Sequence, residues 1–220
     1  LQNNSKDLLV VVWLCEALVR THQINGLRIG LLILNKLISE YWEIIWPIID
    51  EDDAEARVAP FVWLNTALVT RMNQSIVLLQ PTISRTECIH LIDWEKAIKD
   101  NLNDGITREK IRGSTNKEDI DWLLDIKNCS EKSLIIVKEI STKLDQFLKA
   151  QSPSLNILKK TIESIYNFST SIIKSLENEK KLLSKPEQNT NIKNNENIQV
   201  KDEVMSHTMN LMNKNFKYEL

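Results

Sequence analysis

The chain has 220 residues, of which 42% are hydrophobic and 26% are charged, and its formal net charge at pH 7 is −2. This balance gives no electrostatic drive toward nucleic acid or an anionic membrane surface, since binding to either would need a concentrated basic face. Only 4 glycines and 5 prolines are present, and because all-β folds use both residues in their tight turns, the scarcity favours long helices.

The spacing of apolar residues indicates an all-α fold. We expect a single multi-helix domain over residues 1–183, which includes a C-terminal antiparallel helical hairpin, followed by a flexible tail over 184–220. Residues 184–203 are polar and rich in asparagine, so they bury too little surface to offset chain entropy. The apolar residues in 203–213 predict either a short docking helix or the first turn of a further domain.

The first helix is expected over residues 5–20, with Ser5 as its N-cap. Residues 8–19 are apolar on nearly every face, which is typical of a buried central helix. Asn25 and Gly26 mark the break after it.

Two more helices follow in the first half of the chain. A stripe of apolar residues with helical spacing predicts a helix over 27–45, which Pro47 ends. The next helix is expected over 53–79, with Pro60 in its first turns or at a kink, and Pro81 ends it. Residues 82–92 alternate poorly and are compatible with an extended segment.

Short elements are expected in the middle of the chain. Asp93 can cap a helix over 94–100, and residues 100–114 fit a loop or a short turn of helix. Thr115 and Glu118 have the spacing of a capping box, which starts the next helix.

Two long apolar stripes predict the helical hairpin. The first is interrupted near Ser130, and the second follows the start signal of Ser152 and Pro153. Because the loop between them is short, the two helices should pack antiparallel. The first stripe comprises Leu123, Ile126, Leu134, Val137, Ile140, Leu144 and Leu148, and the second Leu155, Leu158, Ile162, Ile165, Ile172 and Leu176.

A run of acids between the second and third helices is the first candidate site. It comprises Asp50, Glu51, Asp52, Asp53 and Glu55. A calcium loop of the EF-hand type also needs a glycine at its sixth position, and no glycine is present here. We interpret the run as a solvated turn that places acids at the N-terminus of the next helix. The alternative is a docking surface for a basic partner.

The tryptophans around this turn form the second candidate. Trp42, Trp46 and Trp63 are expected to be a core cluster that locks the corner between the helices. A platform for stacked bases would interleave arginine and lysine with the aromatics, whereas acids surround these residues.

Catalytic and metal patterns are missing from the sequence. It contains no GxSxG, P-loop, HExxH or GxGxxG motif, and no histidine lies three to five residues from another histidine or a cysteine. Cys15, Cys88 and Cys129 are widely spaced, which favours reduced thiols over a disulfide framework. The longest apolar run, residues 8–15, is too short to span a bilayer. We therefore expect no enzyme activity, no cofactor, no metal and no direct membrane insertion.

The first third of the chain resembles the N-terminal domain of the ImpA/TssA family of type VI secretion proteins. In that family, a Ser-Lys-Asp-Leu block, a Trp-Leu step, a small residue, Gly-Leu, Tyr-Trp and Pro occur in this order. An acidic turn that ends in an arginine follows, and in this chain that arginine is Arg57. The matching positions are Ser5, Lys6, Asp7, Leu8, Trp13, Leu14, Ala17, Gly26, Leu27, Tyr41, Trp42 and Pro47. Weaker likeness continues to about residue 176.

The resemblance implies a cytoplasmic, non-catalytic protein that helps to build a contractile tail. Its partners would be baseplate, membrane-complex, tube or sheath proteins, and its motif residues would be mainly structural. Ring formation in the family belongs to a C-terminal region outside the span of the resemblance. The alternative is a helical adaptor or regulator that carries this domain outside any secretion apparatus, and gene neighbourhood separates the two.

Overall fold

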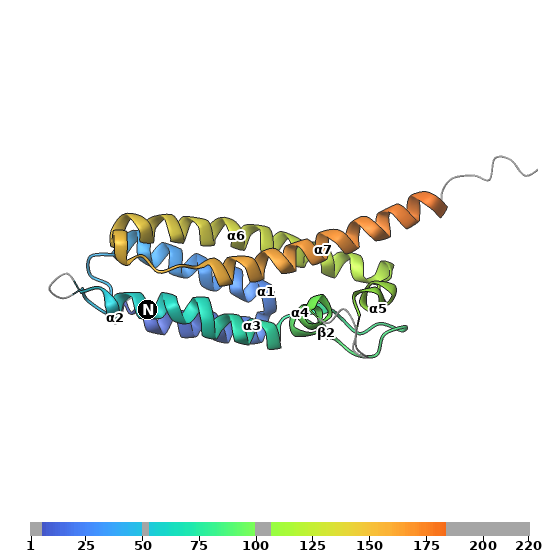
Figure 1. Ribbon diagram of the computed structural model, residues 1–220, viewed down its shortest axis with the longest axis horizontal. Helices are drawn as coiled ribbons and strands as arrows, with labels where there is room; N and C mark the ends of the chain where they lie inside the picture. The colour runs from blue at the N-terminus through green and yellow to red at the C-terminus, as the bar shows by residue number, and fades with distance from the viewer. Residues whose placement is uncertain (1–5, 50–52, 100–106, 184–220) are drawn as a thin grey trace, which may run out of the picture. The chain divides into compact units, whose positions relative to one another are not determined.

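The computed structural model describes residues 6–49, 53–99 and 107–183 (Figure 1). The chain divides into the units Leu1–Asn178 and Glu179–Leu220. Of the second unit, only the last helical residues, 179–183, are described. The expected tail over 184–220, with its short helix at 203–213, therefore lies outside the described residues and stays a prediction.

Helix α1 (Leu8–Tyr41) is a hairpin of two helical arms, residues 8–21 and 24–41, which we call the first and second arms. The chain reverses at His22 (φ −128°, ψ 15°) and Gln23 (φ 57°, ψ −139°). The expected break at Asn25 and Gly26 is therefore misplaced by about one turn. Gly26 lies inside the second arm, where a Cβ atom would stand 1.9 Å from the carbonyl oxygen of Leu18. This glycine is needed for close approach of the arms rather than for a turn.

The start of α1 differs from the prediction in its cap. Asp7 is the N-cap residue, and its Oδ1 accepts hydrogen bonds from the backbone N–H groups of Leu9 (2.7 Å) and Val10 (3.4 Å). Ser5 lies outside the described residues. An aspartate at this position satisfies two free N–H groups and also places a negative charge at the positive end of the helix dipole.

The first arm is not buried all round, which corrects the expectation of a central helix. One face is fully buried, and Trp13 on the opposite face is 53% exposed. The buried residues are Leu8, Val11, Val12, Cys15 and Val19, and the exposed apolar ones include Leu9 and Val10. The arm packs against the second arm on one side and against α3 on another, so an outward face remains.

The third predicted helix is interrupted and ends early. It consists of α2 (Glu55–Trp63), the π-helical segment η1 (Leu64–Leu68) and α3 (Val69–Ser75). Residues expected to complete the helix instead form strand β1 (Val77–Leu79), which pairs antiparallel with β2 (Ile89–His90). All three residues of β1 are buried, and a short run that is buried on both faces carries no helical period. The extended reading of residues 82–92 is confirmed for β2.

Short helices follow the sheet. Helix α4 (Leu91–Lys99) begins three residues before the expected position, and Asp93 therefore lies in its first turn, where Oδ2 accepts a hydrogen bond from the N–H of His90 (2.9 Å). Helix α5 (Arg108–Gly113) confirms the short helical turn in this region, and Thr107 caps it. Residues 100–106 lie outside the part that the structure describes.

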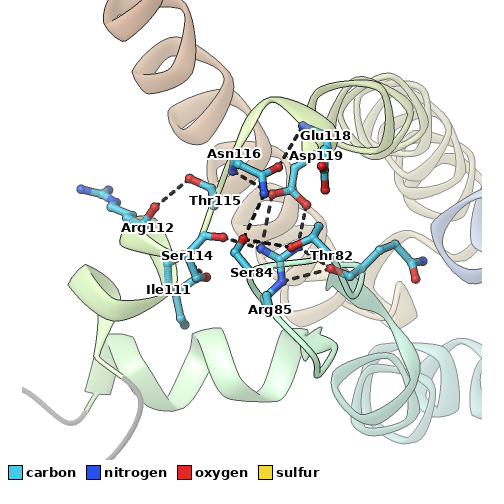
Figure 2. A network of polar contacts seen from close by, with 11 residues as sticks. Thr82, Ser84, Arg85, Ile111, Arg112, Ser114, Thr115, Asn116, Glu118 and Asp119 are labelled. Carbon is cyan, nitrogen blue, oxygen red and sulfur yellow. Dashed lines mark hydrogen bonds and ion pairs between the residues drawn. The ribbon is translucent and has the colours of Figure 1, made fainter.

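The predicted capping box is shifted by one residue. Asn116 and Asp119 form it at the ends of a 3-10 turn (Lys117–Asp119), in place of Thr115 and Glu118. Figure 2 shows why: Asp119 is also the partner of Arg85, with an Nη2–Oδ1 distance of 2.6 Å. Both side chains are buried, and Arg85 donates further hydrogen bonds to the carbonyl groups of Gln80 and Ser114. This network ties the loop after β1 to the start of the next helix.

The helical hairpin is confirmed. Helices α6 (Ile120–Leu148) and α7 (Asn156–Leu183) run antiparallel and are joined through a 3-10 turn (Lys149–Gln151) (Figure 1). Both predicted apolar stripes face the core; Leu134 is only partly buried. Helix α6 lies parallel to the second arm of α1: Asn35 Nδ2 donates to Glu139 Oε2 (2.7 Å), and Lys143 Nζ donates to Asn35 Oδ1 (2.6 Å).

Helix α7 is capped from a distance. The Oδ1 atom of Asn65, in the π-helical segment, accepts from the N–H groups of Ile157 (2.9 Å) and Leu158 (3.0 Å). The helix therefore begins at Asn156, three residues after the expected Ser152–Pro153 start. No described helix is long and apolar enough to cross a membrane.

Candidate interaction site

The corner between α1 and α2 presents three apolar side chains to solvent. Ile44 is 60% exposed, Trp46 57% and Ile48 51%. The residues between and after them alternate inward: Ile45 is fully buried, and Ile49 packs against the core. The three exposed residues lie at and on either side of the β-bridge at Trp46, after a turn over residues 42–44. We call Ile44, Trp46 and Ile48 the corner strip.

Backbone contacts hold the corner strip against the start of α1. The N–H of Trp46 donates to the carbonyl oxygen of Lys6 (2.7 Å), and the N–H of Leu8 donates to the carbonyl oxygen of Trp46 (2.9 Å). These two bonds make a parallel bridge between Asp7 and Trp46. The Trp46–Pro47 peptide bond is cis. The strip is therefore an ordered edge of the domain rather than a loose loop.

Arg57 holds the other side of the corner. Its guanidinium donates to three carbonyl oxygens, those of Trp42 (2.7 Å), Ile45 (2.7 Å) and Pro47. The side chain is only 2% exposed. A rigid fork of five N–H donors suits this task, because the carbonyl groups after a helix end have no intrahelical partner.

The electrostatics of Arg57 are dominated by its burial. Loss of solvent lowers the pKa of the guanidinium from its usual value, and the negative charge of Glu43 opposes this shift. The carbonyl dipoles stand in for the missing water. Arg57 is therefore a structural cation that serves the backbone and is not available to a ligand.

Trp42 completes the internal support of the corner. It is 8% exposed, and its ring stacks on that of Phe147 in α6 with a centroid distance of 4.6 Å and an interplanar angle of 19°. The guanidinium of Arg57 lies 4.8 Å from the Trp42 ring centroid. The prediction of a buried tryptophan cluster is confirmed for Trp42. It is wrong for Trp46, which points outward, and Trp63 is only partly buried.

The acidic run surrounds the start of α2. Asp53 accepts a hydrogen bond from the N–H of Glu55 (2.9 Å), and Glu55 lies in the first turn of α2. Both are exposed, and the N–H of Ala54 between them donates to Gln151 (3.1 Å). This placement agrees with the helix-dipole reading. The remaining acids, Asp50, Glu51 and Asp52, lie outside the described residues, and no group of three metal-binding side chains occurs within the described ranges.

The corner has a one-sided charge. Glu43 near the strip is exposed like Asp53 and Glu55, whereas Arg57, the only lysine or arginine over residues 40–57, is turned inward. The exposed charges among the described residues of this segment are therefore negative, although Lys6 brings a cation to the same corner, with its Nζ over the Tyr41 ring. Apolar side chains beside mainly negative residues are complementary to a partner that combines apolar and basic side chains.

The other motif residues divide between core and surface. Leu8 and Leu27 are fully buried, and Lys6 lies over the Tyr41 ring with Nζ 4.4 Å from its centroid. Leu14 and Pro47 are half-buried, while Trp13 and Ala17 are exposed on the first arm. Sequence reasoning missed Ile44, Ile48 and Phe147; the alternation after Trp42 is the signal that marks the first two.

Comparison with known proteins gives two matches. Residues 1–66 match the sequence model of a family described as ImpA, N-terminal, type VI secretion system. The structure is similar to that of an N-terminal domain, including the conserved ImpA_N region, of the TssA component of the type VI secretion system from Burkholderia cenocepacia. That match has a TM-score of 0.63 and 21% sequence identity, and it covers 78% of this chain and 72% of the other. No curated protein matches.

Proposed function

We propose that this chain, which carries an ImpA N-terminal region on the fold of a TssA N-terminal domain, is a non-catalytic assembly module of a type VI secretion system. The observation that carries the proposal is the match over residues 1–66. This span contains both arms of α1, the corner strip and Arg57. The partners would be baseplate, membrane-complex, tube or sheath proteins, met in the cytoplasm.

The corner is the docking surface that we propose for this role. It is preorganised, since Arg57 and the Asp7–Trp46 bridge hold its backbone, so little ordering entropy is lost when a partner binds. Its exposed tryptophan is a side chain of the type that dominates interface energetics. The acidic residues Asp50, Glu51, Asp52, Asp53 and Glu55 would select a basic partner and speed its approach.

The described nucleophilic and charged groups in the core favour binding over catalysis. Burial raises the pKa of the Cys15 thiol to about 12, so the thiol stays protonated at neutral pH and is a poor nucleophile. Arg57 is committed to backbone carbonyl groups, and Arg85 is committed to Asp119 and two carbonyl groups. These groups stabilise the fold.

The proposal is tested by a pull-down with the full 220-residue chain. Purified tube, sheath and baseplate proteins and the soluble parts of the membrane complex are offered separately. We expect the chain to retain at least one of them, and Trp46→Ser to weaken that retention. Ile135→Ser is the matched control, because Ile135 is 55% exposed on α6, away from the corner. Retention of none of these proteins would overturn the assembly role, and equal losses in both variants would overturn the corner as its surface.

A further inference from the structure

A second surface of the same helical domain has the opposite charge to the corner. A hollow of about 440 Å³ lies between α4, α5 and α7, and residues of all three helices line it. Arg112 of α5 and Lys160 of α7 are its cations, and Ile98 of α4 contributes an apolar side chain. We call it the basic hollow. Its volume falls within the range of about 300–1,000 Å³ that is usual for binding sites.

The side chains that would meet a partner at the basic hollow are open to solvent. Ile98 is 38% exposed, and Arg112, Lys160 and Asn167 on the same lining are exposed as well. Figure 2 shows the Arg112 side chain pointing away from the polar network of the neighbouring loop. A partner can therefore reach an apolar side chain, two cations and an amide without any rearrangement of the core.

The two cations of the basic hollow are available to an acid from outside. Within the described part of the chain, neither Arg112 nor Lys160 makes an ion pair. Glu163, the acid on the lining, is paired with Lys159 at an Nζ–Oε1 distance of 3.7 Å. Glu95 of α4 accepts a hydrogen bond from a serine of α7 (2.7 Å). The described side chains of the hollow and its border therefore keep a net positive charge.

The corner has the properties that the basic hollow would select. The corner strip is exposed and apolar, and Glu43, Asp53 and Glu55 beside it are exposed acids. Apolar and basic side chains are what the corner requires of a partner, and the hollow offers both. Figure 1 shows α2, which follows the corner, at one end of the helical domain and α4 and α5 at the other. The corner of one copy can therefore meet only the hollow of another.

We propose that the corner strip of one copy of this chain binds in the basic hollow of a second copy. The Trp46 indole enters the hollow beside Ile98, with the Arg112 guanidinium over its ring, because tryptophan is the best aromatic partner for a cation. The acids of the corner face Lys160. Since the two surfaces differ, the contact is head-to-tail, and its repetition gives a ring or an open filament. The inference rests on the corner as a docking surface and adds the chain itself as one of its partners.

Analytical ultracentrifugation of the full chain tests the contact. The weight-average mass of the original chain should rise between about 10 μM and about 1 mM, because a contact centred on one side chain is small and weak. Trp46→Ser and Arg112→Glu should each weaken the association at least about tenfold. Both residues are exposed, so circular dichroism should show both variants folded. Lys110→Glu makes the same charge change on α5 outside the lining and should leave the association unchanged.

A mixture of the two weakened variants identifies a head-to-tail contact. Arg112→Glu keeps an intact corner and Trp46→Ser keeps an intact hollow, so an equimolar mixture should form a 1:1 pair that grows no further. A contact between two corners would survive in Arg112→Glu alone, and one between two hollows would survive in Trp46→Ser alone. Either survival, a mixture without the pair, or an original chain whose mass does not rise would overturn the proposal.

The pull-down of secretion proteins separates this inference from the proposed function. Arg112→Glu leaves the corner unchanged, so it should retain the same secretion protein as the original chain. Loss of self-association with retention intact would overturn neither the assembly role nor the corner as its surface. Self-association without retention of any secretion protein would overturn the assembly role and leave the head-to-tail contact standing.

Discussion

The chain changes direction between packed helices at two places, the corner between α1 and α2 and the reversal at His22 and Gln23 inside α1. The two places are stabilised in opposite ways. At the reversal, the chain turns within two residues, and Gly26 and Gly30 let the arms approach closely. At the corner, the chain passes through a turn at residues 42–44 and a β-bridge at Trp46, and the remote side chain of Arg57 satisfies its carbonyl groups. The tight turn keeps Ile24 buried, whereas the corner held by Arg57 leaves Ile44, Trp46 and Ile48 exposed. The comparison therefore explains why the corner strip faces solvent.

The largest expected effect separates the two tryptophans of the corner. Trp42→Ala removes a buried ring that stacks on Phe147, so unfolding should become easier by about 3–5 kcal/mol. Trp46→Ala should change the free energy of unfolding by less than about 1 kcal/mol, because its ring is mostly in solvent. Urea titration with constant m-value measures both. Equal losses would show that Trp46 is a core residue.

Loss of the Arg57 guanidinium is expected to lower the free energy of unfolding almost as much as loss of the Trp42 ring. Arg57→Met leaves three carbonyl groups without a donor, and each unpaired buried acceptor costs about 1–3 kcal/mol. We expect a loss of at least about 3 kcal/mol. Arg57→Lys should lose less, because an ammonium group can still donate to some of these carbonyl groups, but it should not restore full stability, because it cannot reproduce the planar fork. Thermal unfolding of both variants checks this order. A loss below about 1 kcal/mol for Arg57→Met would mean that the corner does not depend on the guanidinium.

Substitution of Gly26 tests whether close packing of the two α1 arms stabilises the reversal. Gly26→Ala places a Cβ atom 1.9 Å from the Leu18 carbonyl oxygen, so the arms must separate, and overpacking of this kind costs about 1–3 kcal/mol. Gly113→Ala is the matched control, because nothing lies within 4 Å of the added atom. Its effect should stay within about 0.5 kcal/mol. If both substitutions behave alike, close packing does not fix the reversal.

The smallest effect is expected from calcium. The acidic run lacks the glycine and the spacing of a calcium loop, so millimolar calcium should leave the midpoint of thermal unfolding of the full chain unchanged. A ligand that binds the folded state must raise it. A clear rise that disappears in Asp52→Asn would assign the corner to a metal rather than to a protein partner.

Sequence periodicity was sufficient for the long elements of this fold. The stripes of α6 and α7 repeat at helical spacing over many turns, so their buried faces and antiparallel order followed from the residues alone. The β1 strand was not predicted, because three buried apolar residues show no period of their own. The exposed face of the first arm was missed for a related reason: apolar composition does not reveal which side of a helix has no neighbour.

Local capping rules identified the right neighbourhood but not the right residue. Asp7 and Asn116 are the N-cap residues where Ser5 and Thr115 were expected. The cap at Asn116 depends on Asp119, which also forms an ion pair with Arg85 in the loop after β1. Asn65 caps α7 from another helix altogether. The candidate site was only partly predictable for the same reason. The acidic run and the tryptophans are visible in the sequence, but the inward turn of Arg57 depends on carbonyl groups 10–15 residues earlier in the chain.

The central claim is that the corner strip is a preorganised docking surface. The most direct test is calorimetric titration of the partner that the pull-down retains, with the original chain, Trp46→Ser, and Ile135→Ser. Unfolding of each variant is measured alongside. The account predicts that Trp46→Ser weakens binding at least tenfold, about 1.4 kcal/mol, with the fold intact and with Ile135→Ser unchanged. Undiminished affinity of a folded Trp46→Ser variant would contradict it.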